Sequence, residues 1–291
     1  MRQRFHESFP QKVNTGKLFV VATPLGNLED MSPRAVRALS SVTLVAAEDT
    51  RSAQRLFSHF QLRVPVLSYF IGNEAQRTPR FVERMRNGET IALISDAGLP
   101  GISDPGERLI RASLDANLPV EVVPGPSASL TALVGSGLPT GRFTFIGFLP
   151  RDRTPRIEEL ARLRTRAETL IFFEAPVRTA TTLADLALAF GEARRACVAR
   201  ELTKLHEEYL RGTLAELAER TAAAPPRGEV TIVVEGSCDA PTPTIDLEAS
   251  IDERLAAGQS PKEISTALAA LTGKSRRQIY QLVLSRRSQR S

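Results

Sequence analysis

Short apolar runs alternate with amphipathic stretches from residue 17 to residue 235. Runs rich in β-branched residues predict strands, and stretches with apolar side chains three or four positions apart predict helices. The first series places strand-like runs at 17–23, 41–48, 64–70, 90–95 and 119–125 and helix-like stretches at 51–60 and 78–88. A further helix is predicted to begin after Ser32, a capping residue, with Pro33 at its first position.

A second series follows Pro126. It places strand-like runs at 142–150, 168–176 and 196–201, helices at 127–138, 156–167 and 178–191, and two closing segments at 207–220 and 228–236. In the third helix Leu183, Leu186 and Phe190 share one face, and Gly191 suits the C-terminal cap. Such alternation predicts α/β layers with largely parallel sheets. We therefore expect two α/β domains, 17–125 and 126–236.

Beyond residue 236 the pattern changes to a short polar stretch followed by helices. Residues 237–244, SCDAPTPT, have the composition of a linker. Ser260 and Glu263 form a capping-box pattern before a helix, and a tight turn at Thr272–Gly273 precedes a basic helix. Apolar side chains line one face of each helix: Ile264, Leu268 and Leu271 in the first, and Ile279, Leu282 and Val283 in the second. This outline over 245–291 fits a helix-turn-helix or a small helical packing module.

Composition narrows the class of protein. Hydrophobic residues make up 42% and charged residues 24% of the 291 residues, which is typical of globular proteins. No apolar run is long enough to span a membrane, and the N-terminus lacks the apolar core of a secretory signal, so residues 1–16 are expected to be a disordered extension. Cys197 and Cys238 fit neither a metal site nor a disulfide framework, and we expect a cytoplasmic location.

Positive charge is concentrated at the C-terminus. The chain carries a net charge of +5, and residues 274–291 contain Lys and Arg but no Asp or Glu. A basic segment of this kind suits a polyanionic partner, although it also suits a tail that is simply solvated.

The stretch SDAGLPGISDPG, residues 95–106, holds more special backbone residues than a connection between a strand and a helix needs. Asp104 is expected to cap the next helix, with Pro105 at its first position and Glu107 three residues after the cap. That role leaves SDAGLPG unexplained. Gly98 permits unusual dihedral angles and close backbone approach, and Asp96 follows the carboxyl end of a strand, where α/β sheets bind ligands.

Three other predicted strands end in similar loops. TPLGN (23–27), AEDTR (47–51) and PGPSAS (124–129) follow the first, second and fifth strands, and Ser127 is a possible helix cap. Four such loops in one sheet predict a shared ligand cleft. The nicotinamide and P-loop glycine motifs, the G-x-S-x-G elbow and metal-ligand spacing are all absent from the sequence.

Seven motifs occur in a specific order and carry a resemblance to a known family. They are TPLGNLEDMSPRA, AEDTR, SDAGLPGISDPG, VVPGPSA, FIGFLPR, FFEAPVR and ARELTKLHEE. Together they resemble the tetrapyrrole methylase-like, or class III, S-adenosylmethionine-dependent methyltransferases. Within that class they are similar to the 16S rRNA (cytidine-1402)-2′-O-methyltransferases. The resemblance covers roughly residues 17 to 236 and shows no departure at a motif position.

The resemblance implies a homodimer and two α/β domains of the tetrapyrrole methylase type, with S-adenosylmethionine bound in the cleft between them and a small helical domain appended. It also implies the positions that contact this methyl donor. They are Leu25, Gly26, Asp96, Ala97, Gly98, Ile102, Ser103, Ser127, Ala128, Ala175 and Pro176.

The chemistry of methyl transfer to a ribose hydroxyl suggests catalytic residues. A group that stabilises the developing alkoxide and a base that accepts the proton would both help. The AEDTR and ELTKLHEE motifs offer Asp49, Arg51, Lys204 and Glu207 as candidates. We expect Lys204 or Arg51 to stabilise the oxygen and a carboxylate to accept the proton, although each residue alone also fits a structural salt bridge.

The basic C-terminal helix is the candidate for RNA contacts. Its phosphate-binding candidates are Lys274, Arg276, Arg277, Arg286 and Arg287. The small ribosomal subunit is the expected partner. Two alternatives stay open: a small-molecule methyltransferase of the same fold, acting on a tetrapyrrole or another metabolite, and a non-catalytic RNA-binding or ribosome assembly protein.

Overall fold

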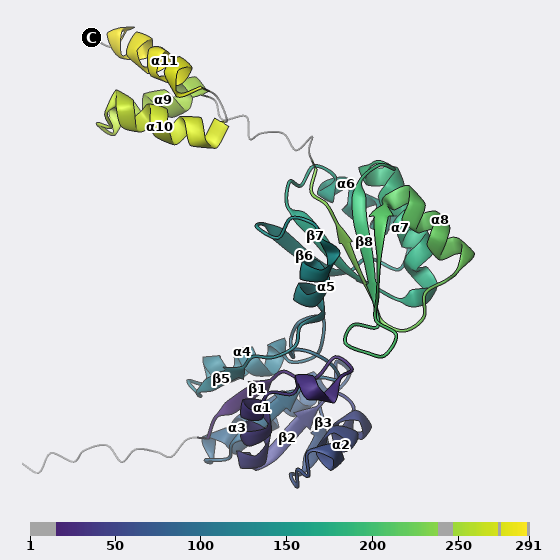
Figure 1. The fold of residues 1–291 in the computed structure, drawn as a ribbon. Helices are drawn as coiled ribbons and strands as arrows, with labels where there is room; N and C mark the ends of the chain where they lie inside the picture. Colours follow the sequence, from purple (N-terminus) through teal and green to yellow (C-terminus); the bar gives the residue numbers. More distant parts are fainter. Residues whose placement is uncertain (1–15, 238–246, 273–274, 290–291) are drawn as a thin grey trace, which may run out of the picture. The chain divides into compact units, whose positions relative to one another are not determined.

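The computed structural model describes residues 16–237, 247–272 and 275–289 (Figure 1). The chain divides into two compact units. The larger one comprises 1–164 and 168–235, and the smaller one comprises 165–167 and 236–291. The expected N-terminal extension lies almost wholly outside the described residues, as do Cys238 and Lys274. The domain boundaries expected from the sequence stay predictions.

The first sheet of the larger unit is entirely parallel. Its strands are β1 (Leu18–Val21), β2 (Leu44–Ala47), β3 (Val66–Ser68), β4 (Ile91–Ile94) and β5 (Val120–Val123), in the order β3-β2-β4-β1-β5. Its helices are α1 (Pro33–Ser41), α2 (Thr50–His59), α3 (Glu74–Arg86) and α4 (Glu107–Asp115), with the short 3₁₀ helix η1 (Leu28–Asp30) after β1.

Both faces of this sheet are covered, which explains why its central strands read as continuous apolar runs. One apolar core joins the sheet to α1 and α2 and includes Leu39 and Phe57. The other joins it to α3 and α4 and includes Phe81, Met85 and Leu109. The Ser32 hydroxyl accepts a hydrogen bond from the backbone N–H of Ala35, so the predicted cap of α1 is confirmed.

The second sheet is mixed. Its strands are β6 (Phe143–Phe148), β7 (Thr169–Glu174), β8 (Arg195–Arg200), β9 (Glu208–Thr213) and β10 (Val230–Val234), in the order β6-β7-β10-β8-β9. Only the β6–β7 pair is parallel. The expectation of largely parallel sheets is therefore wrong for this half. The antiparallel pairing was not predictable from the sequence pattern, because segment 207–220 combines the hairpin strand β9 with the helix that directly follows it.

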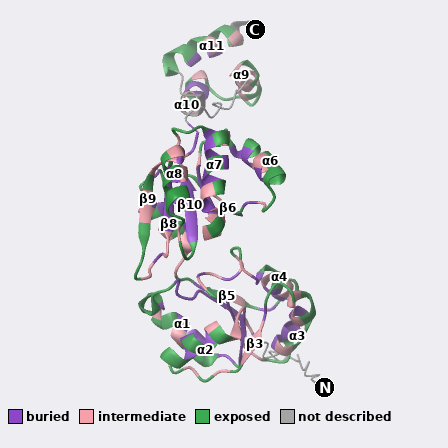
Figure 2. Cartoon of the chain, turned by 90° about the vertical axis from the view of Figure 1, so that its right-hand side faces the viewer, coloured by how far each residue is buried: buried purple, intermediate pink, exposed green. Residues whose placement is uncertain are grey.

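Helices cover the second sheet on both faces. They are α5 (Ala128–Ser136), α6 (Arg153–Leu163), α7 (Thr179–Phe190) and α8 (Leu214–Ala223), with the 3₁₀ helix η2 (Pro176–Arg178) before α7. One core packs α6, α7 and α8 against the sheet, and α5 packs on the other face. Strand β10 is therefore buried along its whole length (Figure 2).

The smaller unit contains three helices among its described residues. They are α9 (Leu247–Ala256), α10 (Pro261–Thr272) and α11 (Arg276–Gln289). Its core holds Ile251, Ile264, Leu268, Ile279 and Val283, which confirms most of the predicted apolar faces. The side chain of Ser260 and the Glu263 carboxylate exchange hydrogen bonds with each other's backbone N–H, as the capping-box pattern predicts. No helix among the described residues is long and apolar enough to cross a membrane.

Candidate functional site

A hollow of about 230 Å³ opens at the carboxyl edge of the first sheet. Its walls come from the loop after β1, the first turns of α2 and the end of β4. The lining residues are Thr23, Pro24, Leu25, Gly26, Leu28, Ser52, Ala53, Arg55, Leu56, Ile94, Ser95 and Asp96. Three of the donor-contact candidates, Leu25, Gly26 and Asp96, therefore lie together, and the strand-end loops meet as the sequence predicted.

The β1 and β4 loops are tied to each other by main-chain hydrogen bonds. The N–H of Thr23 donates to the Gly98 carbonyl at 2.8 Å, and the N–H of Gly98 donates to the Thr23 carbonyl at 3.0 Å. Gly98 has a φ of 77°, a conformation that favours glycine. A Cβ on Gly98 would lie 3.5 Å from the Leu25 side chain and 3.6 Å from the Pro126 carbonyl. The loops after β1, β4 and β5 thus converge at this glycine.

Four other donor-contact candidates, from the loops after β4 and β5, do not line the hollow. Ala97 and Ala128 pack against the apolar cluster that contains Leu25. Ile102 is 44% exposed, which leaves its side chain available to a ligand. Ser127 occupies the N-cap position of α5, but its hydroxyl contacts the Ser129 hydroxyl instead of a helix N–H, so the expected capping bond is absent there.

Ser103 brings the β4 loop to the second sheet. It holds a φ of 61°, which is uncommon for a residue with a side chain. Its hydroxyl lies 3.2 Å from the position that a Cβ of Gly147 in β6 would occupy. Gly147 itself has a φ of 77° and lies at a register shift of the β6–β7 pair. The donor-loop candidate therefore contacts the strand whose carboxyl end leads into FLPR.

Acidic side chains gather beside the hollow. Burial raises the pKa of Asp104 to about 7, and the nearby carboxylates of Glu48, Asp96 and Glu229 add to the rise. Burial also raises the pKa of Glu48 and of Asp96. The N–H of Asp96 donates a hydrogen bond to Glu48 at 3.4 Å. This cluster favours a positively charged ligand and keeps one carboxyl group, that of Asp104, near its titration point at neutral pH.

The prediction that Asp104 caps the following helix is wrong. Helix α4 begins at Glu107, and its N-cap is Gly106, with a φ of 144°. The N–H of Gly106 donates to the Glu74 carboxylate at 2.9 Å, which supplies the cap from α3. Asp104 is instead half-buried, and the nearby Ser95 side chain partly offsets the rise of its pKa. The sequence did not predict a half-buried Asp104, because SDPGE matches the usual pattern of a helix N-terminus.

Asp49 and Arg51 form a local pair at the start of α2. The Asp49 carboxylate accepts hydrogen bonds from the backbone N–H of Arg51 at 2.7 Å and from its guanidinium at 2.8 Å. These contacts lower the pKa of Asp49 to about 2, which makes it a weak proton acceptor. The Arg51 side chain is 86% exposed. The predicted catalytic roles of both residues stay predictions.

Lys204 extends from the β8–β9 loop across the β1 loop. A Cβ on Gly26 would lie only 2.2 Å from Cγ of Lys204, so only glycine admits the lysine stem here. The Lys204 ammonium pairs with Glu201 at 2.9 Å and with Glu229 at 3.3 Å. Burial opposes its charge, but these carboxylates raise the pKa of Lys204, and the side chain remains protonated. Lys204 is therefore a fixed cation beside the acidic cluster.

Further hydrogen bonds stabilise the β8–β9 loop and connect it to the β1 loop. The Glu207 carboxylate accepts a hydrogen bond from the N–H of Thr203 at 2.6 Å, and the Thr203 hydroxyl accepts one from the N–H of Asn27 at 3.2 Å. Glu201 and Thr203 both have positive φ values, 51° and 64°. Glu207, a predicted catalytic residue, thus shapes the loop that carries Lys204.

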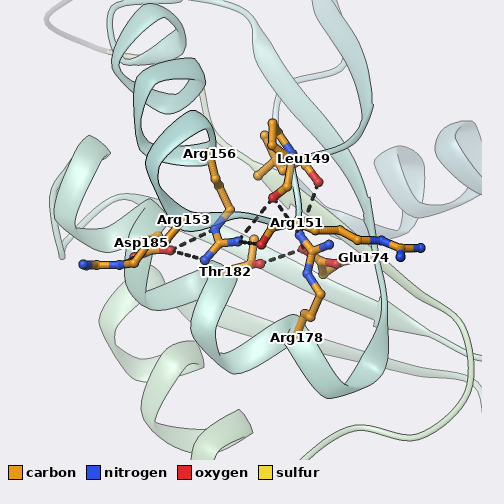
Figure 3. A network of polar contacts seen from close by, with 9 residues as sticks. Leu149, Arg151, Arg153, Arg156, Glu174, Arg178, Thr182 and Asp185 are labelled. Atoms are coloured by element: carbon orange, nitrogen blue, oxygen red, sulfur yellow. Dashed lines mark hydrogen bonds and ion pairs between the residues drawn. The ribbon is translucent and has the colours of Figure 1, made fainter.

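Ala175 and Pro176 lie at the carboxyl end of β7, where Ala175 occupies the N-cap position of η2. The N–H of Ala175 donates to the Glu174 carboxylate at 2.8 Å. Glu174 belongs to a buried polar network with Arg178 and Thr182 (Figure 3). The turn is therefore rigid, and its predicted contact with the methyl donor stays a prediction.

The candidate RNA contacts of the smaller unit separate into two groups. Arg276 and Arg277 line a hollow of about 510 Å³ together with Lys262 and Tyr280. Arg286 instead pairs with Asp252 and Glu248, the former at 3.3 Å, so its charge is balanced within the unit. Arg287 is exposed near the end of α11, and Lys274 lies outside the described residues.

The fold and the convergent loops define the class of protein. A family model described as Tetrapyrrole (Corrin/Porphyrin) Methylases matches residues 17–218, more than half of the chain. The chain belongs to this family of methyltransferases.

Similar proteins with assigned names show which group of methylases the chain belongs to. A ribosomal RNA small subunit methyltransferase I from Synechocystis sp. is 44% identical over 272 residues, which are 92% of this chain and 98% of that protein. Proteins of the same name from Xylella fastidiosa and Pseudomonas aeruginosa are 45% and 44% identical over 91% and 94% of this chain, and 98% and 99% of their own. Within the methylases, the chain belongs to the ribosomal RNA small subunit methyltransferase I family.

Solved structures show the same fold at lower sequence identity. The methyltransferase CobJ has a TM-score of 0.59 and 18% identity, over 77% of this chain and 95% of that one. The uroporphyrin-III C-methyltransferase from Thermus thermophilus, complexed with S-adenyl homocysteine, has a TM-score of 0.53 and 20% identity, over 76% and 97%. These similarities confirm the predicted two-sheet methylase architecture.

Proposed function

We propose that the protein transfers a methyl group from S-adenosylmethionine to the ribose 2′-hydroxyl of cytidine 1402 in 16S rRNA. The chain is an S-adenosylmethionine-dependent rRNA methyltransferase. The proposal specifies the nucleotide, cytidine 1402, and the acceptor atom, its 2′-oxygen. The main support is that the chain aligns over nearly the whole length of relatives named for methylation of small-subunit rRNA. The site adds a proton acceptor, Asp104, and a fixed cation, Lys204.

The methyl donor fits the region around the hollow at the carboxyl edge of the first sheet. Gly26 is exposed in the lining of the hollow, and the acidic side chains beside the hollow suit the positive sulfonium centre. When bound, the donor supplies an activated methyl group on a neutral leaving group. Leu25, Ala97 and Ala128 form an apolar wall beside this region.

The protein's residues handle the proton and the developing charge. The 2′-oxygen forms the new bond to carbon as the carbon–sulfur bond breaks, and the hydroxyl proton must leave. Asp104 suits the proton acceptor because burial raises its pKa to about 7, whereas Arg51 lowers that of Asp49 to about 2. Lys204 suits the oxygen-stabilising cation because its ammonium is fixed by two carboxylates.

The helical unit suits non-specific contacts to the RNA. Lys262, Arg276 and Arg277 supply positive charge around its hollow, and the Tyr280 ring, 40% exposed, offers a face for base stacking. The pairing of Arg286 with acidic residues makes it a weaker candidate than sequence alone suggested. A cytoplasmic location and a homodimer remain predictions, the latter testable by light scattering.

The deciding experiment incubates the protein with radiolabelled S-adenosylmethionine and small ribosomal subunits, naked 16S rRNA or tetrapyrroles. We expect label in the rRNA, and mapping of the modified nucleotide to place it on the ribose of cytidine 1402. Label on a tetrapyrrole would favour the small-molecule alternative. Calorimetry that detects no donor binding would favour a non-catalytic RNA-binding protein.

A further inference from the structure

The loop after β6 is held by its main-chain carbonyls. Arg178 donates from Nη2 to the carbonyls of Leu149 and Pro150, each at 3.2 Å. Arg156 donates from Nη1 to the carbonyls of Pro150 at 3.2 Å and Arg151 at 2.8 Å. Three consecutive carbonyls are therefore fixed by two guanidinium groups (Figure 3).

Each of these two arginines is fixed in turn by an acidic side chain. Arg156 is 4% exposed and pairs with Asp185, itself 3% exposed, at 2.8 Å. Arg178 pairs with Glu174 at 3.2 Å, and Glu174 also accepts a hydrogen bond from the Thr182 hydroxyl at 2.6 Å. A buried charge is costly unless it is paired, so this network holds the loop in one conformation.

Arg151 contributes only its backbone to this network. Its side chain is exposed, and no dashed line reaches its guanidinium in Figure 3. Among the residues that the structure describes, no hydrogen bond or ion pair engages that guanidinium. The neighbouring Arg153, by contrast, donates to Asp185 at 3.2 Å. The network therefore presents one unpaired cation on a rigid loop.

The position of this loop connects it to the reaction. Gly147, in the strand that leads into the loop, meets the Ser103 hydroxyl of the donor-loop candidate. Arg151 follows Gly147 by four residues, so its Cα lies within about 14 Å of Gly147 even if the chain is fully extended. A nucleic acid that enters the donor site along the carboxyl end of β6 therefore passes within reach of the Arg151 side chain.

We propose that Arg151 binds a backbone phosphate of the RNA substrate close to the methylated nucleotide. The inference rests on the proposed function, because the anion it requires is the RNA backbone. A guanidinium is always charged and offers a planar fork that fits phosphate oxygens, and a fixed backbone reduces the entropy lost on binding. The Arg156–Asp185 and Arg178–Glu174 pairs act as positioning groups behind it.

The first test compares Arg151→Ala with the matched control Arg162→Ala, in the full chain. Arg162 in α6 is 72% exposed and pairs with Glu159 of the same helix, outside the network. Loss of a charged hydrogen bond predicts a KM for small ribosomal subunits about ten- to hundredfold higher in Arg151→Ala. The slope of log affinity against log salt for single-stranded RNA should fall by about 0.7, because one phosphate contact is lost. Arg151→Lys should lie between the wild type and Arg151→Ala. Arg162→Ala should resemble the wild type, and donor affinity should stay the same in all three variants.

A second variant tests the positioning. Thr182→Val removes one hydrogen bond to Glu174 with little change in volume, and it should raise the KM for RNA severalfold without changing donor affinity. Combined with Arg151→Ala, it should add no further effect. Additive effects would show that the network does not act through Arg151.

Two results would overturn the inference while leaving the proposed function intact. One is an Arg151→Ala variant with the KM and salt slope of Arg162→Ala. The other is a loss of donor affinity with an unchanged salt slope, which would place the guanidinium on the donor's carboxylate. If the wild-type protein methylates no RNA at all, the proposed function itself fails.

Discussion

Asp104→Asn tests the ionisation that is central to the candidate site. In the folded protein, burial and the neighbouring carboxylates raise the pKa of Asp104 from the ordinary 3.8 to about 7. The folded state therefore holds this proton more tightly than the unfolded state does. Below about pH 4 the group is protonated in both states, and its ionisation costs no stability. As the pH rises from about 4 to about 7, the unfolded state loses the proton first, and the folded protein becomes less stable.

The size of the effect follows from the same shift. A pKa raised from 3.8 to about 7 corresponds to an upper limit of about 4 kcal/mol. Because Asp104 is only partly buried, solvent screening reduces this to about 2 kcal/mol. An asparagine cannot ionise, so the variant should lack this loss of stability, and its advantage over the wild type should grow between pH 4.5 and pH 8.

Urea unfolding at pH 4.5, 6 and 8 measures this difference. The informative quantity is the pH dependence of the free energy of unfolding at an unchanged m-value, because the substitution has its own constant effect. Asp115→Asn is the matched control: Asp115 is exposed at the end of α4, in water in the folded and unfolded states alike. If Asp104→Asn loses as much stability as the wild type between pH 4.5 and pH 8, Asp104 does not carry a raised pKa.

Three further predictions concern the same site and the helical unit. Gly26→Ala should displace the stem of Lys204, cost about 1–3 kcal/mol in thermal unfolding and lower kcat, whereas Gly141→Ala, with nothing within 4 Å of its Cβ, should have no such effect. Lys204→Met should lower kcat at least tenfold, about 1.4 kcal/mol in the barrier, with unchanged donor affinity in calorimetry; unchanged turnover would remove its role at the oxygen. Tyr280→Ala should weaken single-stranded RNA binding by about 1–3 kcal/mol in anisotropy titrations and leave the salt slope unaltered, whereas an equal loss with Tyr280→Phe would exclude stacking.

The sequence predicted the first sheet better than the second. Its central strands β1, β2 and β4 are buried on both faces by helices, so each reads as an apolar run. In the second half, strand β9 is half-exposed and follows β8 through a loop without a glycine turn. The pattern of apolar and polar residues over 207–220 therefore did not indicate a hairpin. Strand direction is decided by tertiary packing, which is why the antiparallel pairs were not foreseen.

The convergence of loops was predictable, but the roles within it were not. Proximity of the strand ends follows from parallel topology, and Leu25, Gly26 and Asp96 do line one hollow. The role of Asp104 depends on burial beside Glu48 and Glu229, which lie far apart in the sequence. Local spacing could only describe it as a helix cap.

Gly26 shows how one residue type can satisfy two demands. The family resemblance assigned this glycine to the contacts with the methyl donor. The structure supplies an internal reason, because the Lys204 stem occupies the space that any side chain would need. Since Lys204 comes from the second sheet and Gly26 from the first, the glycine also lets the two sheets share one site. A ligand in the hollow and the ammonium of Lys204 therefore both depend on the same missing Cβ. Substitution at this position should couple donor binding to turnover, whereas substitution of Lys204 should separate them.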